Sequence, residues 1–219
     1  MSKRDPIVLT LALALSLACG TVASITPTPQ PLSPTPTLSA LSRAILASQS
    51  VAPTTPAGFT LEDEDRVGIS IARPTDWVRD AGTTELPTSG QPVDHVVYAH
   101  VEPGIVQMMS IQTLSNYYPY ESDTDRLKQI LGMYAQRAAE VNLKVLDFAD
   151  EVTVAGRPAQ AMSYRLDDQR SGLPLFSIIL VLAMPDNTAV VLQWAANESR
   201  QEETTDLFLK MLPTVRLLP

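Results

Sequence analysis

Apolar and polar residues alternate with a period of two along most of the chain after residue 58. The pattern is clear at 66–74, where Val67, Ile69 and Ile71 fall on one face. Such alternation is typical of a strand with one buried face. Further alternating runs occupy residues 59–63, 95–101, 105–115, 144–156, 159–167 and 188–196. Residues 175–184 are almost continuously apolar, which predicts a central strand covered on both faces.

Two segments change to the helical period. Apolar residues recur every three or four positions from Leu127 to Val141, and Ser122 with Asp125 resembles a capping pair ahead of them. Near the end of the chain, Ser199 and Glu202 have the spacing of a capping box before an apolar helix over 207–212.

Strands joined by short turns, with one helix in the middle and one near the end, predict an α+β domain over residues 58–219. We expect an antiparallel β-sheet with helices packed on it. The segment 81–92 is rich in Gly, Thr and Pro and is expected to be a loop.

The first 18 residues have the composition of an export signal. Lys3 and Arg4 precede an apolar run from Ile7 to Ala18. This run is roughly a dozen residues long, whereas a helix needs about 20 to cross a bilayer. We therefore interpret residues 1–18 as a signal peptide.

Cys19 is the single cysteine of the chain and directly follows this run. Residues 15–20 resemble a bacterial lipobox, in which the cysteine becomes the lipidated first residue of the mature protein. Ser16 and Leu17 stand in the reverse of the usual order. Ordinary cleavage after Ser16-Leu17-Ala18 and secretion is the alternative. The preferred hypothesis is palmitate-type lipidation of Cys19 and anchoring on the extracytoplasmic face of the cell membrane.

Residues 19–57 are rich in Thr, Pro and Ser. Proline-rich chains favour extended polyproline II and do not pack a core, so we expect a disordered linker with room for a short helix near 38–47. Fully extended, such a linker could reach on the order of 100 Å, and it would hold the domain away from a membrane surface.

The order of elements resembles the PsbP-like fold family. The resemblance runs through Ile69 and Ile71 to Pro74-x-x-Trp77, the helix at 127–141, the Gly156-x-Pro158 turn, the apolar hairpin 175–194 and the final helix with Val215-Arg216-Leu217. Arg73 and Asp76 depart from the family pattern, which has an aromatic before the proline and a glycine before the tryptophan. The resemblance implies an α/β/α sandwich and a binding or assembly domain without enzymatic activity or cofactor.

The net charge of −8 argues against a nucleic-acid partner, since phosphate binding needs a basic surface. A single cysteine excludes an internal disulfide framework. Among metal-ligand residue types, Asp94, His100 and Glu102 fall on one face of a predicted strand and are weak candidates for a divalent-cation site. Solvent-facing strand residues are the simpler interpretation, and no metal site is assigned.

Three tyrosines, Tyr117, Tyr118 and Tyr120, lie close together in a predicted loop. Exposed tyrosines favour protein contacts, but packing against the sheet edge beneath the following helix is the simpler interpretation. The signal, the linker, the family resemblance and the lack of a catalytic motif make a lipid-anchored, non-enzymatic domain that binds or helps to assemble a protein partner at the membrane the leading hypothesis. The alternative is a secreted or anchored module that binds a solute or a divalent metal.

Overall fold

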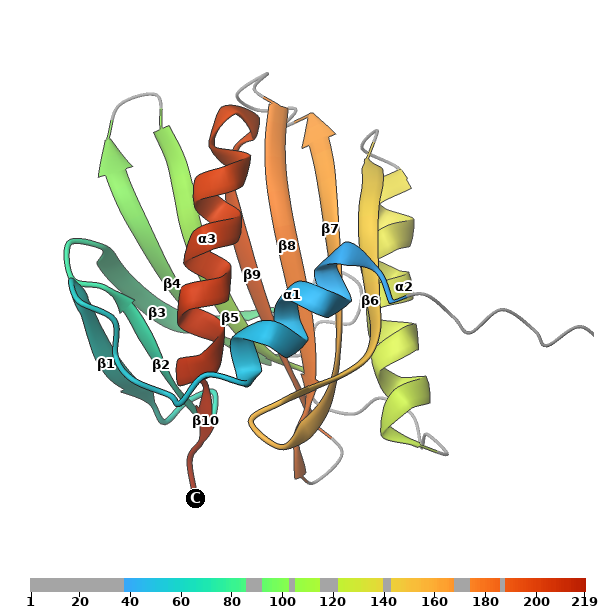
Figure 1. The fold of residues 1–219 in the computed structure, drawn as a ribbon, viewed down its shortest axis with the longest axis horizontal. Helices are drawn as coiled ribbons and strands as arrows, with labels where there is room; N and C mark the ends of the chain where they lie inside the picture. Colours follow the sequence, from blue (N-terminus) through green and yellow to red (C-terminus); the bar gives the residue numbers. More distant parts are fainter. Residues whose placement is uncertain are drawn as a thin grey trace, which may run out of the picture. The chain divides into compact units, whose positions relative to one another are not determined.

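The computed structural model contains two antiparallel sheets and three α-helices in the part of the chain that it describes (Figure 1). The described residues are 38–85, 92–102, 105–114, 122–139, 143–167, 174–185 and 188–219. The α+β class expected from the sequence is confirmed.

The smaller sheet has the strand order β1-β2-β10. Its strands are β1 (Phe59–Glu64), β2 (Ile69–Pro74) and β10 (Arg216–Leu217). The larger sheet has the order β3-β4-β5-β9-β8-β7-β6. Its strands are β3 (Val78–Glu85), β4 (Pro92–Glu102), β5 (Ile105–Leu114), β6 (Lys144–Val154), β7 (Arg157–Asp167), β8 (Pro174–Ala183) and β9 (Ala189–Asn197).

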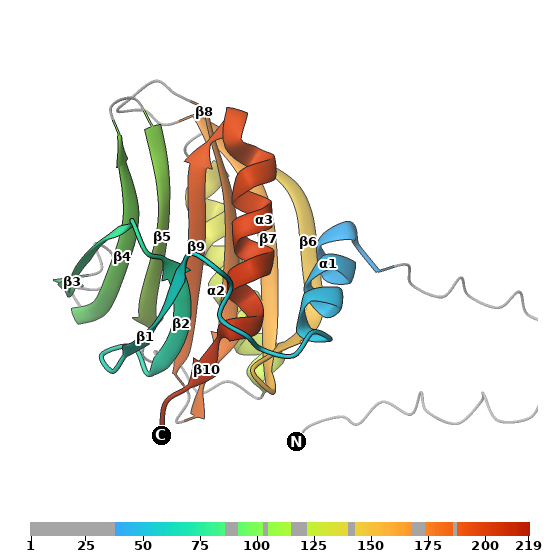
Figure 2. The ribbon, with the colours of Figure 1, turned by 60° about the vertical axis from the view of Figure 1, so that its left-hand side comes forward.

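The helices lie on both faces of the larger sheet (Figures 1 and 2). They are α1 (Ala40–Gln49), α2 (Asp123–Ala139) and α3 (Gln201–Met211), with the short 3₁₀ turns η2 (Glu198–Arg200) and η3 (Leu212–Thr214) beside α3. Helices α1 and α3 cover one face together with the smaller sheet, whereas α2 covers the opposite face.

Strand β8 is central, as its apolar sequence predicts. Every residue from Phe176 to Ala183 is buried, because β9 and β7 flank the strand and both of its faces are covered. On one of these faces Trp194 of β9 meets Phe208 of α3 edge to face, with the ring centroids 4.9 Å apart. Both tryptophans, Trp77 and Trp194, are buried in this core.

The expected linker contains a helix that belongs to the folded domain. In α1, Ile45 is fully buried and Leu41 is nearly so, and both join the core beneath β6 and α3. The backbone N–H of Leu41 donates to Asp147 of β6 at 2.8 Å. The domain therefore begins before residue 58, because the short amphipathic helix at 40–49 has an apolar face to bury.

Two further expectations need correction. The segment expected as a loop from residue 81 begins as strand, because β3 pairs with β4 through Glu85 and Thr83 donates to Asp94 at 2.7 Å. Ser199 does not cap α3, since the chain enters the helix through η2 and the N-cap residue is Arg200. The capping pair of α2 is confirmed, with the Asp125 N–H 3.2 Å from Ser122 Oγ.

Candidate functional site

An open pocket of about 360 Å³ lies where the end of β4 meets the turn after β2 and the start of α3. Its polar lining consists of Asp76, His100, Glu102, Gln107, Arg200 and Glu203. Its apolar lining consists of Phe59, Pro74, Trp77 and Leu207. We call this feature the acidic pocket.

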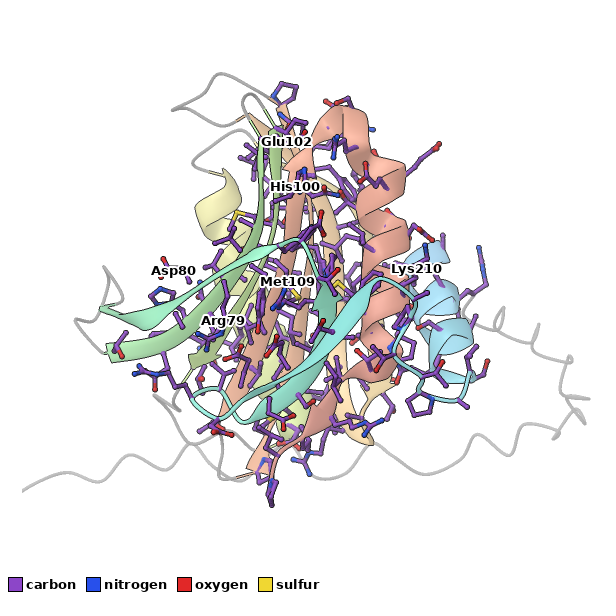
Figure 3. All side chains as sticks on the ribbon, turned by 90° about the vertical axis from the view of Figure 1, so that its left-hand side faces the viewer. Arg79, Asp80, His100, Glu102, Met109 and Lys210 are labelled. Atoms are coloured by element: carbon purple, nitrogen blue, oxygen red, sulfur yellow. The ribbon has the colours of Figure 1, made fainter. Side chains whose placement is uncertain are left out.

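The strand register explains how two of these residues come together. His100 of β4 lies opposite Gln107 of β5, which in turn lies opposite Ala196 of β9. His100 and Glu102 are two positions apart on β4, so their side chains point to the same face of the sheet. Figure 3 shows the two close together near the end of the strand. The chain from β9 then continues through η2 into α3, which brings Arg200 and Glu203 to the same place.

The imidazole of His100 lies between two carboxylates. Its Nδ1 atom is 3.5 Å from Asp76 Oδ2, and its Nε2 atom is 3.0 Å from Glu102 Oε1. A neutral imidazole donates through one nitrogen, whereas a protonated one donates through both. The two carboxylates therefore lie on either side of one imidazole, which donates to both only when it is protonated.

A buried amide organises the part of the pocket next to α3. Gln107 is only 4% exposed, and its Nε2 donates to Glu203 Oε1 at 3.0 Å while its Oε1 accepts from Arg200 Nη1 at 3.0 Å. Arg200 Nη1 is also 3.5 Å from Glu203 Oε1. Both ends of the buried amide are satisfied, which fixes the two charged side chains at the rim.

The charge of the lining is negative. Three carboxylates (Asp76, Glu102 and Glu203) face one guanidinium (Arg200), which leaves two negative charges while His100 is neutral. A pocket of this composition attracts a cationic group.

A second charged cluster lies between the two sheets, with Glu64 and Tyr98 buried and Arg79 reaching them from the surface. Glu64 of β1 is 2% exposed and accepts from Arg79 of β3 at 2.8 and 2.6 Å and from the hydroxyl of Tyr98 of β4. Burial acts to raise the pKa of Glu64, but the hydrogen bonds from Arg79 and Tyr98 and the nearby positive charges outweigh it and lower the pKa. Burial and the Glu64 charge raise the pKa of Tyr98. These hydrogen bonds join β1 of the smaller sheet to β3 and β4 of the larger sheet.

The structure does not bring the three cation-site candidates together. His100 and Glu102 line the acidic pocket, but Asp94 lies six residues earlier on β4, which places it about 20 Å away. Asp94 instead accepts from Thr83 and lies 3.8 Å from Arg66. Side chains on one face of a strand point in the same direction, but side chains six residues apart are too far from each other to bind one ion. Within the described ranges, no group of three or more His, Cys, Asp or Glu side chains could hold a metal ion.

Cys19 and the loop tyrosines Tyr117, Tyr118 and Tyr120 lie outside the described residues. Sequence reasoning missed Asp76, Arg200 and Glu203, which come from distant parts of the chain and share no motif spacing. Among the helices that the structure describes, none is long and apolar enough to cross a membrane.

Comparison with solved structures gives distant likenesses. No family model matches the sequence, and no curated protein matches it significantly. Among solved structures, a Pseudomonas aeruginosa protein of unknown function described as a putative regulator is 13% identical, with a TM-score of 0.39, covering 74% of this chain and 98% of that chain. LpqN of Mycobacterium tuberculosis, involved in cell envelope biogenesis, is 12% identical, with a TM-score of 0.38, covering 76% of this chain and 82% of that chain. These likenesses do not confirm the PsbP-like resemblance, which stays a prediction.

Proposed function

We propose that this chain is a non-enzymatic binding protein, held by a lipid on Cys19 at the extracytoplasmic face of the membrane. Its acidic pocket binds a basic side chain presented by a partner protein. The observation that carries this proposal is the excess of carboxylates over cations around the pocket, beside the buried ring of Trp77.

The proposed location rests on the order of features in the N-terminal sequence. An apolar run too short to span a bilayer leads to Cys19, and a Thr/Pro-rich segment follows before the folded domain. A lipid on the cysteine and an extended spacer together would present the domain to partners near the membrane.

The lining of the pocket suits a lysine or arginine side chain. Asp76, Glu102 and Glu203 would pair with the cationic head, and Trp77 and Leu207 would contact the aliphatic stem. The volume of about 360 Å³ is at the lower end of the range of roughly 300 to 1,000 Å³ found for ligand pockets. The carboxylates of Asp76 and Glu102 are more than half exposed, so each pair alone would contribute little and a partner would add further contacts.

The experiment uses the full chain in detergent and simple probes for the basic side chain. N-acetyl-lysine methylamide and N-acetyl-arginine methylamide are titrated while the ring signals of His100 and Trp77 are followed by NMR. N-acetyl-norleucine methylamide has a similar stem without the charge. We expect saturable shifts with the charged probes only, and weaker binding at higher salt.

A matched pair of variants tests the location of binding. Glu203→Gln removes one pocket carboxylate, whereas Asp206→Asn removes a carboxylate of α3 that pairs with Lys210 at 2.7 Å and does not line the pocket. Glu203→Gln should weaken binding and Asp206→Asn should not. Equal effects of the two variants, or equal shifts with the norleucine probe, would refute the proposal. A separate titration with a divalent cation, followed by the same NMR signals, tests the metal-binding alternative, and micromolar binding would favour it.

A further inference from the structure

Arg73 does not line the acidic pocket, yet its guanidinium holds the turn that forms one wall of it. Its Nη1 atom is 3.0 Å from the carbonyl oxygen of Pro74, 3.3 Å from that of Thr75 and 3.1 Å from that of Trp77. One nitrogen therefore contacts three carbonyls of the turn between β2 and β3.

The other terminal nitrogen and the face of the guanidinium contact two other strands. Its Nη2 atom donates to Glu62 of β1 at 2.8 Å, and its central carbon lies 5.4 Å from the ring centroid of Tyr98 of β4. The side chain of Arg73 is only 16% exposed. A planar guanidinium can contact a carboxylate, an aromatic face and several carbonyls at the same time, whereas the compact ammonium of lysine cannot.

The turn held in this way carries two of the pocket residues. Asp76 lies 3.5 Å from His100, and Trp77 supplies the aromatic wall. Two backbone bonds also support the turn, from Thr75 N–H to the carbonyl of Gly58 at 3.1 Å and from Trp77 N–H to the carbonyl of Pro74 at 3.3 Å. These bonds do not involve the guanidinium, so the turn keeps partial support when Arg73 is replaced.

We propose that Arg73 is a positioning residue of the acidic pocket. It sets the places of Asp76 and Trp77 through the turn carbonyls, and it thereby sets the affinity of the pocket for a cationic group. The ligand in this inference rests on the proposed function, whereas the effect of Arg73 on the Asp76–His100 contact does not depend on any ligand.

Two lysine substitutions in the full chain provide a matched test. Arg73→Lys keeps the positive charge and loses the contacts with the turn. Arg79→Lys makes the same exchange at the other arginine that reaches the Glu64–Tyr98 region, and the guanidinium of Arg79 donates to Glu64. NMR follows the ring signals of His100, with His95, the second of the two histidines, as the internal reference.

We expect Arg73→Lys to shift the His100 signals toward those of Asp76→Asn and to weaken binding of N-acetyl-lysine methylamide about 10-fold. Arg79→Lys should leave the affinity within about 2-fold of the wild type. Adding Arg73→Lys to Asp76→Asn should weaken binding by less than the two separate losses combined, because Arg73 acts partly through Asp76.

Unchanged His100 signals and affinity in folded Arg73→Lys would overturn the inference, as would an equal effect of Arg79→Lys. If the wild type does not bind the probe, the proposed function fails. The His100 signals alone then show whether Arg73 positions Asp76. Should Arg73→Lys not fold, Glu62→Gln releases the guanidinium at a more exposed site and should produce a smaller shift of the same signals.

Discussion

The hydroxyl of Tyr98 in β4 donates a hydrogen bond to the carboxylate of Glu64 in β1, and this bond joins the two sheets. Tyr98 is fully buried, and Arg79 of β3 donates two further hydrogen bonds to the same carboxylate. A buried carboxylate is tolerated only when it is paired and hydrogen-bonded, so each donor to Glu64 matters for the whole domain.

Replacement of Tyr98 by phenylalanine tests this relationship. The change removes one donor from a buried charge, and we expect a loss of about 1.5 to 3 kcal/mol in the free energy of unfolding. Chemical denaturation of the full chain measures it. Tyr164→Phe is the matched control, because Tyr164 is also buried but its hydroxyl accepts from the neutral amide of Gln193 at 2.9 Å. A loss at Tyr98 no larger than at Tyr164 would contradict the assigned role.

The lowered pKa of Glu64 predicts a loss of stability in acid. The folded protein favours the charged carboxylate, so its contribution is complete above the ordinary glutamate value of 4.5 and is lost as the pH falls through the lower folded-state pKa. Unfolding free energies measured from pH 7 downward should decline below about pH 4.5. Glu64→Gln should be less stable at pH 7 and should show a shallower decline. A decline as steep in Glu64→Gln as in the wild type would assign the effect to other groups.

Helix α1 should contribute to the stability of the domain. Its residue Ile45 is fully buried in the core, and Ile45→Ala is expected to lower the free energy of unfolding by about 2 to 5 kcal/mol. Leu46→Ala alters the neighbouring residue, which is 42% exposed, and should cost far less. Thermal or denaturant unfolding of the two variants distinguishes them. Equal stability of the two would mean that α1 does not share the core.

Lipidation predicts that membrane association depends on Cys19. After expression in a bacterial host, the wild type should fractionate with membranes and incorporate labelled palmitate, whereas Cys19→Ala should do neither after signal processing. Thr21→Ala keeps the thiol and should behave as the wild type does. Processed Cys19→Ala that stays in the membrane fraction would contradict lipid anchoring, and soluble processed wild type would support the secretion alternative.

The sequence by itself determined the strands and their class of fold. Alternation at Ile69 and Ile71 and the continuous apolar run at 175–184 follow from burial of one or both strand faces, which is local information. The capping pair Ser122–Asp125 is also local and appears as expected. The strand β3 could not be predicted in full from the sequence, because its composition favours turns and only its pairing with β4 makes it a strand.

Only the tertiary structure decided the acidic pocket. Asp76, His100 and Glu203 lie far apart in the sequence, and they meet because β4, the turn after β2 and α3 converge at one end of the sheet. Asp94 and His100 show the opposite case. The sequence correctly places them on the same face of β4, but the distance along the strand keeps them apart. Period and capping are properties of neighbouring residues, whereas a pocket depends on which distant segments pack together, and that depends on the core as a whole.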